Sequence, residues 1–335
     1  MRRPLHPAAL WAASALGWLA ASSLPALSQD KFPSRAIRIV SPFPAGAVSD
    51  ISLRLLAERL VERLGTQFVI ENQPTGGGVA AAKAVLSSPP YGHTLALLSN
   101  ATAVSAALFK KLPYDPLADF VPVGGISDFS YVFLTNAKSE LRTLQDVIAA
   151  ARANPGKLNF GTAAAGTSPN LTALLFRKVA GIDFTVVPFR GATDLTVALM
   201  RNDVDVVINA YGAVKANLLD GSLRAIATTA RTRAAALPDV PTVGESGIAN
   251  FEISSWNGLF APAHTPAAAV DRLSRELSLA LAEPALVQRY LELGVEARPL
   301  PPATVAARMR TEIERWSRVI EDAGIERQSG REQNR

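Results

Sequence analysis

The stretch IRIVSPFPAGAVSD, residues 37–50, decides the fold of this chain. Its opening residues are rich in isoleucine and valine and predict a strand, its middle is a proline- and glycine-containing loop, and its end opens a helix expected over 49–64. The same order returns at 68–86 and at 94–109. Strands that alternate with helices of about 10–15 residues predict a parallel α/β sheet.

A second series of the same kind begins after residue 129. Thr143 is expected to N-cap its first helix. The predicted strands of this series lie at 131–134, 158–161, 185–187, 204–208 and 223–228. A long strand is then expected at 251–260, and helices fill most of 265–323.

Two series of this kind favour two α/β domains with a ligand cleft between them. The first domain would hold 29–128 plus 251–325, and the second 129–250, with hinges near Asp128 and Asn250. Residues 326–335 are predicted to be a flexible tail. One continuous sheet is the alternative arrangement.

The N-terminus indicates export. Arg2 and Arg3 precede an apolar run at 8–21, and a small-residue site ends at Ser28, which is typical of a signal peptide over 1–28. An uncleaved anchor is the alternative, but the run is shorter than the roughly 20 residues that span a bilayer. The sequence contains no cysteine, so no lipid anchor can follow the leader. We expect cleavage after about Ser28 and a freely diffusing protein in the periplasm.

Composition excludes several classes of function. Subtracting Arg2 and Arg3 from the 34 basic residues leaves 32 against 29 acidic ones, too weak a charge for a nucleic-acid partner. Only two histidines, His93 and His264, follow the leader, so neither a metal site nor another cofactor is expected. No nucleophile motif or phosphate loop occurs, which argues against an enzyme. The charged residues of one helix read as a solvated face with i,i+4 pairs: Arg54, Glu58, Arg59, Glu62 and Arg63.

Two similar loops carry the best chemistry, a first loop at 41–50 and a second loop at 161–170. Each follows a strand, carries a glycine and ends at a helix start, where Ser49 and Ser168 are expected N-caps and Pro169 fits the first helical position. A helix start exposes unpaired N–H groups and carries about half a positive charge. The pair of loops therefore predicts a carboxylate or phosphate bound between two helix starts.

Three side chains near these loops allow two readings each. Asp50 either pairs with the dipole of its helix or accepts a hydrogen bond from the ligand. Arg190, on the loop after the strand at 185–187, either forks a ligand carboxylate or forms a surface ion pair. Trp256 either walls the cleft or packs in the core.

Several motifs resemble the substrate-binding proteins of tripartite tricarboxylate transporters, the Bug/TctC family. They span almost the whole chain after the leader and come in the family's order. They are Pro42-Phe43-Pro44-Ala45-Gly46 with Asp50, Glu71-Asn72-Gln73-Pro74, Gly92-His93-Thr94-Leu95, Ala153-Asn154-Pro155-Gly156, Gly166-Thr167-Ser168, Val187-Pro188-Phe189-Arg190-Gly191, Leu237-Pro238-Asp239-Val240-Pro241 and Trp256-Asn257-Gly258-Leu259-Phe260.

This resemblance implies a two-domain periplasmic binding protein fold of mainly parallel sheets that closes on a small carboxylate, without catalysis. The expected ligand-binding residues are Phe43, Ala45, Gly46, Asp50, Asn100, Gly166, Thr167, Ser168, Arg190, Gly191 and Trp256. Three positions depart from the family pattern: Ala47 replaces a common glycine, Asn170 a common histidine and Tyr91 a common aspartate.

The expected function is a monomeric periplasmic receptor that delivers a mono- or dicarboxylate, an amino or aromatic acid included, to a membrane permease. One alternative keeps the fold but presents the ligand to a sensor kinase. The other is an exported hydrolase or isomerase that uses Asp50 or Ser168.

Overall fold

A computed structural model describes residues 32–74, 78–163, 167–189, 191–249, 251–322 and 324–327. The predicted leader at 1–28, Gly166, Arg190, the predicted hinge residue Asn250 and most of the predicted tail lie outside the described residues.

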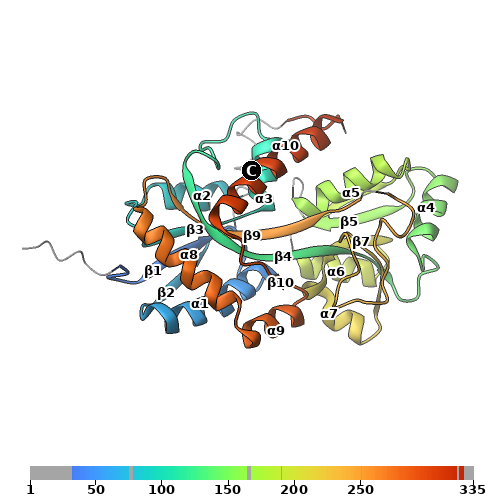
Figure 1. Ribbon diagram of the computed structural model, residues 1–335. Coiled ribbons are helices and arrows are strands. Elements are labelled where there is room, and N and C mark those ends of the chain that lie inside the picture. Colours follow the sequence, from blue (N-terminus) through green and yellow to red (C-terminus); the bar gives the residue numbers. More distant parts are fainter. Residues whose placement is uncertain are drawn as a thin grey trace, which may run out of the picture.

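The first series of elements forms one half of the molecule (Figure 1). Strand β1 (Ile37–Ser41) lies between β2 (Phe68–Asn72) and β3 (Thr94–Ser99) and is parallel to both, and β9 (Ser254–Pro262) adds antiparallel to β3. The helices of this half are α1 (Val48–Leu64), α2 (Val79–Leu86), α3 (Asn100–Leu108), α8 (Ala267–Leu281), α9 (Pro284–Glu292) and α10 (Pro302–Asp322). We call this part the first half.

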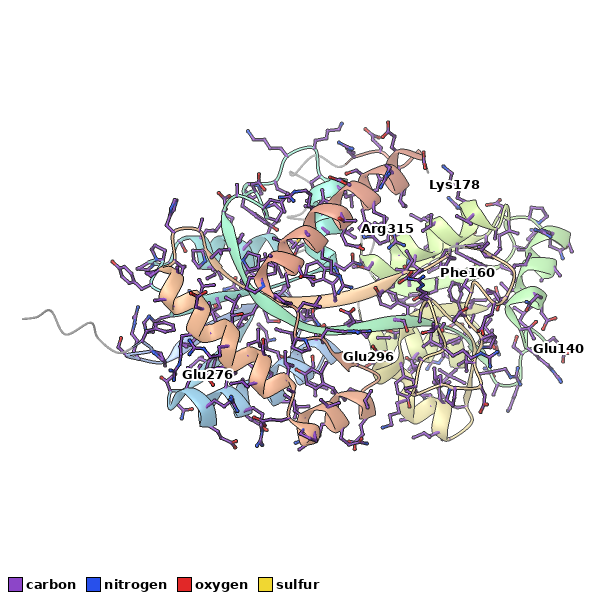
Figure 2. The ribbon with its side chains drawn as sticks, viewed as in Figure 1. Glu140, Phe160, Lys178, Glu276, Glu296 and Arg315 are labelled. Atoms are coloured by element: carbon purple, nitrogen blue, oxygen red, sulfur yellow. The ribbon has the colours of Figure 1, made fainter. Side chains whose placement is uncertain are left out.

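The second series forms the other half. Strand β5 (Asn159–Ala163) lies between β6 (Thr185–Phe189) and β7 (Val206–Ala210), again parallel to both. The remaining elements are β8 (Leu223–Thr228), α4 (Leu144–Ala153), α5 (Ser168–Val179), α6 (Ala192–Met200) and α7 (Tyr211–Leu219). Phe160, Phe176 and Phe184 pack together in its core, and Figure 2 shows Phe160 well inside this second half.

One long strand joins the halves. Strand β4 (Phe120–Asn136) pairs with β9 over 120–130 and with β7 and β8 over 131–136. The short β10 (Glu296–Ala297) pairs with β4 at 127–128. The strand order is β2-β1-β3-β9-β4-β7-β5-β6, so the strands of both halves form one hydrogen-bonded sheet in which β4 belongs to both. In Figure 1, β4 and β9 run side by side across the middle of the molecule.

The sequence predicted a strand only at 131–134, whereas β4 begins at Phe120 and runs through Gly124 and Gly125. These two glycines have a packing role. A Cβ on Gly124 would stand 2.8 Å from Leu277 of α8, and one on Gly125 would stand 2.7 Å from the carbonyl oxygen of Arg298. The strand continues through them because neighbouring segments approach its backbone closely.

The predicted helix caps are confirmed in one case and wrong in two. Thr143 caps α4 and forms a capping box with Asp146. The N-cap of α1 is Ala47 rather than Ser49, and that of α5 is Thr167 rather than Ser168, so Pro169 is the second helical residue. The hydroxyls of Ser49 and Ser168 instead accept hydrogen bonds from Asn257 and Asn100.

Glu58 and Glu62 of the predicted solvated face are exposed, and Arg59 pairs with Glu62 at the i,i+3 rather than the i,i+4 spacing. Arg54 turns to Asp50, at the start of the helix. Arg63 bridges Glu276 of α8 and Glu283, and so ties α1 to the C-terminal helices. Spacing within one helix could not reveal partners from other helices.

Among the described residues, no helix is both long enough and apolar enough to cross a membrane.

Candidate functional site

Helices begin at the carboxyl ends of the parallel strands in both halves, where α/β sheets usually bind ligands. Helix α1 follows β1, α3 follows β3, α5 follows β5 and α7 follows β7. Ser99 caps α3, whereas among the described residues no side chain caps α1, α5 or α7. The first-turn amides of these three helices therefore keep their capacity for other acceptors.

The first loop is braced by a buried carboxylate. Asp50 Oδ2 accepts from the amide of Gly46 at 2.9 Å and from Arg54 Nε at 3.0 Å, and its Oδ1 accepts from Asn72 Nδ2 at 2.7 Å. Asn72 also donates to the carbonyl of Phe43, at 2.9 Å. Ala45 and Gly46 remain exposed at the tip. Asp50 thus shapes the loop through hydrogen bonds to Gly46, Arg54 and Asn72.

The charge state of Asp50 follows from these contacts. Burial alone would raise the pKa of the Asp50 carboxyl, but hydrogen bonds from Arg54, Asn72 and Gly46, together with the Arg54 charge, hold that pKa below its ordinary value. Asp50 is therefore ionised at neutral pH, and Arg54 offsets a negative charge that would otherwise repel an anion.

The second loop is held by neutral groups. Asn170 Nδ2 donates to Thr162 Oγ1 at 3.1 Å, and Thr172 Oγ1 donates to the carbonyl of Ser168 at 2.7 Å. Thr167 is half-buried at the loop's end, and Ser168 is buried. These hydrogen bonds hold the first turn of α5, which begins at Ser168.

Asn100 and Ser168 join the two halves. Asn100 Nδ2, at the start of α3, donates to Ser168 Oγ, at the start of α5, over 3.0 Å. Asn100 Oδ1 accepts from the indole of Trp316 on α10 at 2.9 Å. The Tyr131 hydroxyl, on β4, hydrogen-bonds Ser255 and Ser168, while burial raises the pKa of Tyr131. Two predicted site residues from opposite halves are thus brought into direct contact.

A second contact joins the start of α7 to the first half. A Cβ on Gly212 would stand 2.6 Å from the carbonyl oxygen of Leu293 and 2.9 Å from Cγ2 of Val48, the first residue of α1. The helix starts of α1 and α7, from opposite halves, therefore lie next to each other.

The other predicted residues differ in position. Gly191 is the exposed N-cap of α6. Trp256 is 1% exposed in the core, with the Arg308 guanidinium 5.2 Å from its ring centroid, which favours the packing role over a cleft wall. Gly166 and Arg190 lie outside the described residues, so their predicted contacts stay predictions.

Sequence reasoning missed several polar residues of this region. Asn257 Nδ2 donates to Ser49 Oγ at 3.1 Å and to Ser127 Oγ at 3.0 Å, which links the start of α1 to β9 and β4. Tyr131 and Ser255 meet beside Ser168. The alternation of side chains along β9 could have pointed to Asn257, because it puts Trp256 and Asn257 on opposite faces of the strand.

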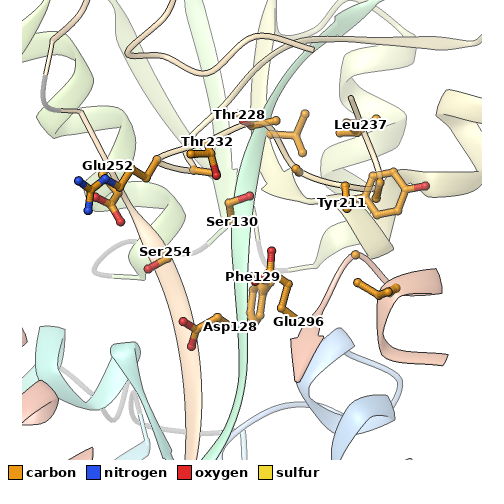
Figure 3. A pocket seen from close by; sticks show the side chains of 18 of the residues that line it. Asp128, Phe129, Ser130, Tyr211, Thr228, Thr232, Leu237, Glu252, Ser254 and Glu296 are labelled. Atoms are coloured by element: carbon orange, nitrogen blue, oxygen red, sulfur yellow. The ribbon is translucent and has the colours of Figure 1, made fainter. Parts of the chain in front are cut away.

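A pocket lies where β4 passes between the halves (Figure 3). Asp128, Phe129 and Ser130 of β4 line it, with Tyr211 from the second half and Glu296 from the first. Its described lining contains none of the predicted ligand-binding residues. The described residues also hold no cluster of three or more side chains able to bind a metal.

Solved structures share this architecture. MatC from Rhodopseudomonas palustris, solved with bound malate, is 32% identical, with a TM-score of 0.78 over 86% of this chain and 100% of that chain. Rpa4515 from R. palustris, solved with adipate, is 30% identical, with a TM-score of 0.81 over 88% and 98%. The periplasmic binding protein BugD is 27% identical, with a TM-score of 0.80 over 89% and 100%. The predicted two-domain periplasmic binding protein fold is confirmed.

Sequence comparison agrees. Protein BugT of Bordetella pertussis is 32% identical over 300 residues, which cover 89% of this chain and 92% of BugT. The family model described as "Tripartite tricarboxylate transporter family receptor" matches residues 52–325. A transport receptor binds its solute without converting it, so the prediction that the chain is not an enzyme is confirmed by its family. The chain belongs to the tripartite tricarboxylate transporter receptors, the TctC family.

Proposed function

We propose that this chain is a periplasmic receptor that encloses a small mono- or dicarboxylate between its two halves and passes it to a tripartite tricarboxylate-type permease. The observation that carries the proposal is the meeting of helix starts from opposite halves, α3 with α5 at Asn100–Ser168 and α1 with α7 at Val48–Gly212. Helix starts present N–H groups and positive dipole ends, which suit a carboxylate. The malate of MatC and the adipate of Rpa4515 support the same ligand class.

Calorimetry at neutral pH tests the ligand class. Malate and adipate are titrated into the purified protein, and malamide and adipamide serve as neutral controls of matched shape. We expect at least one dicarboxylate to bind about a hundredfold more tightly than its diamide, because charge-assisted hydrogen bonds are lost in the amide. Tight binding of a neutral solute with no binding of any carboxylate would contradict the proposal.

The proposal includes the two domains expected from the sequence, 29–128 with 251–325 and 129–250. The change of partners along β4 supports this division, since Ser130 pairs with Ser254 of β9 and Tyr131 with Ala210 of β7. On the return path, the Ile253 amide donates to the carbonyl of Thr229 in the second half. The two crossings lie side by side and can act together as a hinge.

Export and assembly can be tested separately. We infer that residues 1–28 are removed, so the intact mass of protein recovered from the periplasm should correspond to a chain that begins at Gln29. A mass that retains the leader would contradict this. The protein is expected to elute as a monomer on size exclusion. We also expect its loss to abolish carboxylate uptake by the permease rather than signalling by a sensor kinase.

A further inference from the structure

Two contacts connect the halves, one between the starts of α3 and α5 and one at the start of α7, and they differ in kind. At Asn100–Ser168, the halves are joined by a hydrogen bond. At Gly212, they approach so closely that a side chain would not fit. We propose that Asn100 and Gly212 set how far the receptor closes, the first as a latch and the second as the stop. This inference rests on the proposed function only in taking the halves to move relative to each other.

Asn100 is oriented for the latch by α10. The indole N–H of Trp316 is a donor only, so the Asn100 atom that receives it must be the carbonyl oxygen. The amide nitrogen of Asn100 is therefore directed at Ser168. Asn100 is fully buried, and Ser168 and Trp316 are nearly so, which means that opening would have to break this bond and rehydrate both groups.

Helix α10 keeps the latch in place in both states. It packs against α3 in the first half, and Trp316 also donates to Glu312 one turn earlier, at 3.1 Å. Asn100 can therefore stay fixed to α10 while Ser168 moves away with the second half. Of the two hydrogen bonds of Asn100, the one to Ser168 then forms on closure and breaks on opening, while the one from Trp316 stays formed.

The stop lies where α7 begins and α9 ends. Besides the approach of Gly212 to Leu293, Lys215 Nζ donates to the carbonyl of Glu292 at 2.8 Å, a cation at a helix C-terminus. A Cβ on Gly294 would overlap the ring of Tyr211. Tyr211 and Gly294 also line the pocket of Figure 3, so this contact adjoins the crossing of β4.

Gly212 offers a clean test of the stop. It lies inside α7 and does not have a positive φ, so alanine suits its backbone and should favour the helix. The added methyl group would meet Leu293 and Val48, which belong to the other half. Gly244→Ala is the matched control, because its Cβ would stand 3.5 Å from Thr242 Oγ1, an ordinary contact, with no positive φ.

The experiment measures the separation of the halves without any ligand. Because the chain has no cysteine, Lys83→Cys on α2 and Glu140→Cys, near the end of β4, place two fluorophores on opposite halves for energy transfer. Figure 2 shows Glu140 at the outer end of the second half. Asn100→Ala should lower the closed population about fivefold, the effect of one neutral hydrogen bond. Gly212→Ala should lower it about tenfold or more, while Gly244→Ala should match the parent.

A double-mutant cycle secures the latch. Ser168→Ala should open the receptor at least as much as Asn100→Ala does, because it also removes the Tyr131 contact. The double variant should open it by less than the sum of the two single effects, because both remove the Asn100–Ser168 bond. Parent-like energy transfer in Asn100→Ala or in a folded Gly212→Ala variant, or additive effects in the cycle, would overturn the inference. If thermal unfolding shows that Gly212→Ala does not fold, the role of Gly212 as the stop is overturned, because the added methyl group then does more than hold the halves apart, and the cycle decides the latch.

A malate titration of the parent under the same conditions separates the two proposals. Failure of malate and every other carboxylate to bind would count against the proposed ligand class. It would leave the ligand-free comparison of the variants intact.

Discussion

The two loops share a backbone plan but are held by different chemistry. In the first loop, an ionised Asp50 gathers donors from Gly46, Arg54 and Asn72. In the second loop, the neutral Asn170 reaches back to Thr162. A carboxylate next to an anion site needs a compensating cation, and Arg54 supplies it. The second loop has no such need, so the halves should respond differently to mutation and to acid.

Removal of the first brace should have the largest effect. Asp50→Ala leaves the Gly46 amide, the Asn72 amide and Arg54 without their shared acceptor. We expect the free energy of unfolding to fall by about 3 kcal/mol, because hydrogen bonds to a charged group contribute about 1.5–3 kcal/mol each and are not additive. Urea unfolding at neutral pH measures this. A loss below about 1 kcal/mol would show that the loop holds its shape without the carboxylate.

Lowering the pH should weaken the same brace by protonating Asp50, with a smaller loss of stability than Asp50→Ala causes. The pKa of Asp50 is lower in the folded chain than its ordinary value of 3.8, so the folded state favours the ionised form. Its contribution to stability is present above that ordinary value and is lost as the pH falls below it, through the lowered pKa. Urea unfolding between about pH 6 and pH 3 should therefore show a steeper loss for the parent than for Asp50→Asn. Parallel curves would contradict the role of the charge.

The brace of the second loop should cost less to remove. Asn170→Ala deletes the bond to Thr162 Oγ1, and we expect a loss of about 1 kcal/mol, typical of a neutral hydrogen bond. The loss should be the same at both ends of the acid range used for Asp50→Asn, because neither Asn170 nor Thr162 titrates. A loss equal to that of Asp50→Ala would remove the distinction between charged and neutral support.

The sequence predicted the local parts of this site well. Strand, loop and helix at 37–64 were expected and found, because β-branched runs, proline and glycine act over a few residues. The starts of α1 and α5 were placed within two residues of their true positions, whereas α7, which lies between the predicted strands at 204–208 and 223–228, was not predicted. The caps of α1 and α5 were misassigned since Ser49 and Ser168 have partners on distant segments, Asn257 and Asn100.

What depended on tertiary approach could not be predicted. Gly212 and Gly125 look alike in sequence to glycines of turns, yet each is needed because another segment's backbone passes nearby. Arg54 and Glu62 lie on one helix, and helix spacing predicted an exposed ion pair for each. Arg54 instead braces the first loop through Asp50, whereas Glu62 is exposed to solvent. The position of a side chain relative to the other half of the molecule decides such cases, and local periodicity carries no information about it.

The smallest effect should come from the exposed pair on the same helix. Arg59 Nη1 lies 3.0 Å from Glu62, as close as Arg54 Nε lies to Asp50, but the Glu62 side chain is 62% exposed and that of Asp50 2%. Water and salt screen the exposed pair, so Arg59→Ala should lower the free energy of unfolding by less than about 0.5 kcal/mol in urea unfolding. A loss comparable to that of Asp50→Ala would mean that distance alone sets the strength of these pairs. The burial that separates the two carboxylates is the feature that makes Asp50 a structural support, since only a carboxylate shielded from water must find all its partners within the protein.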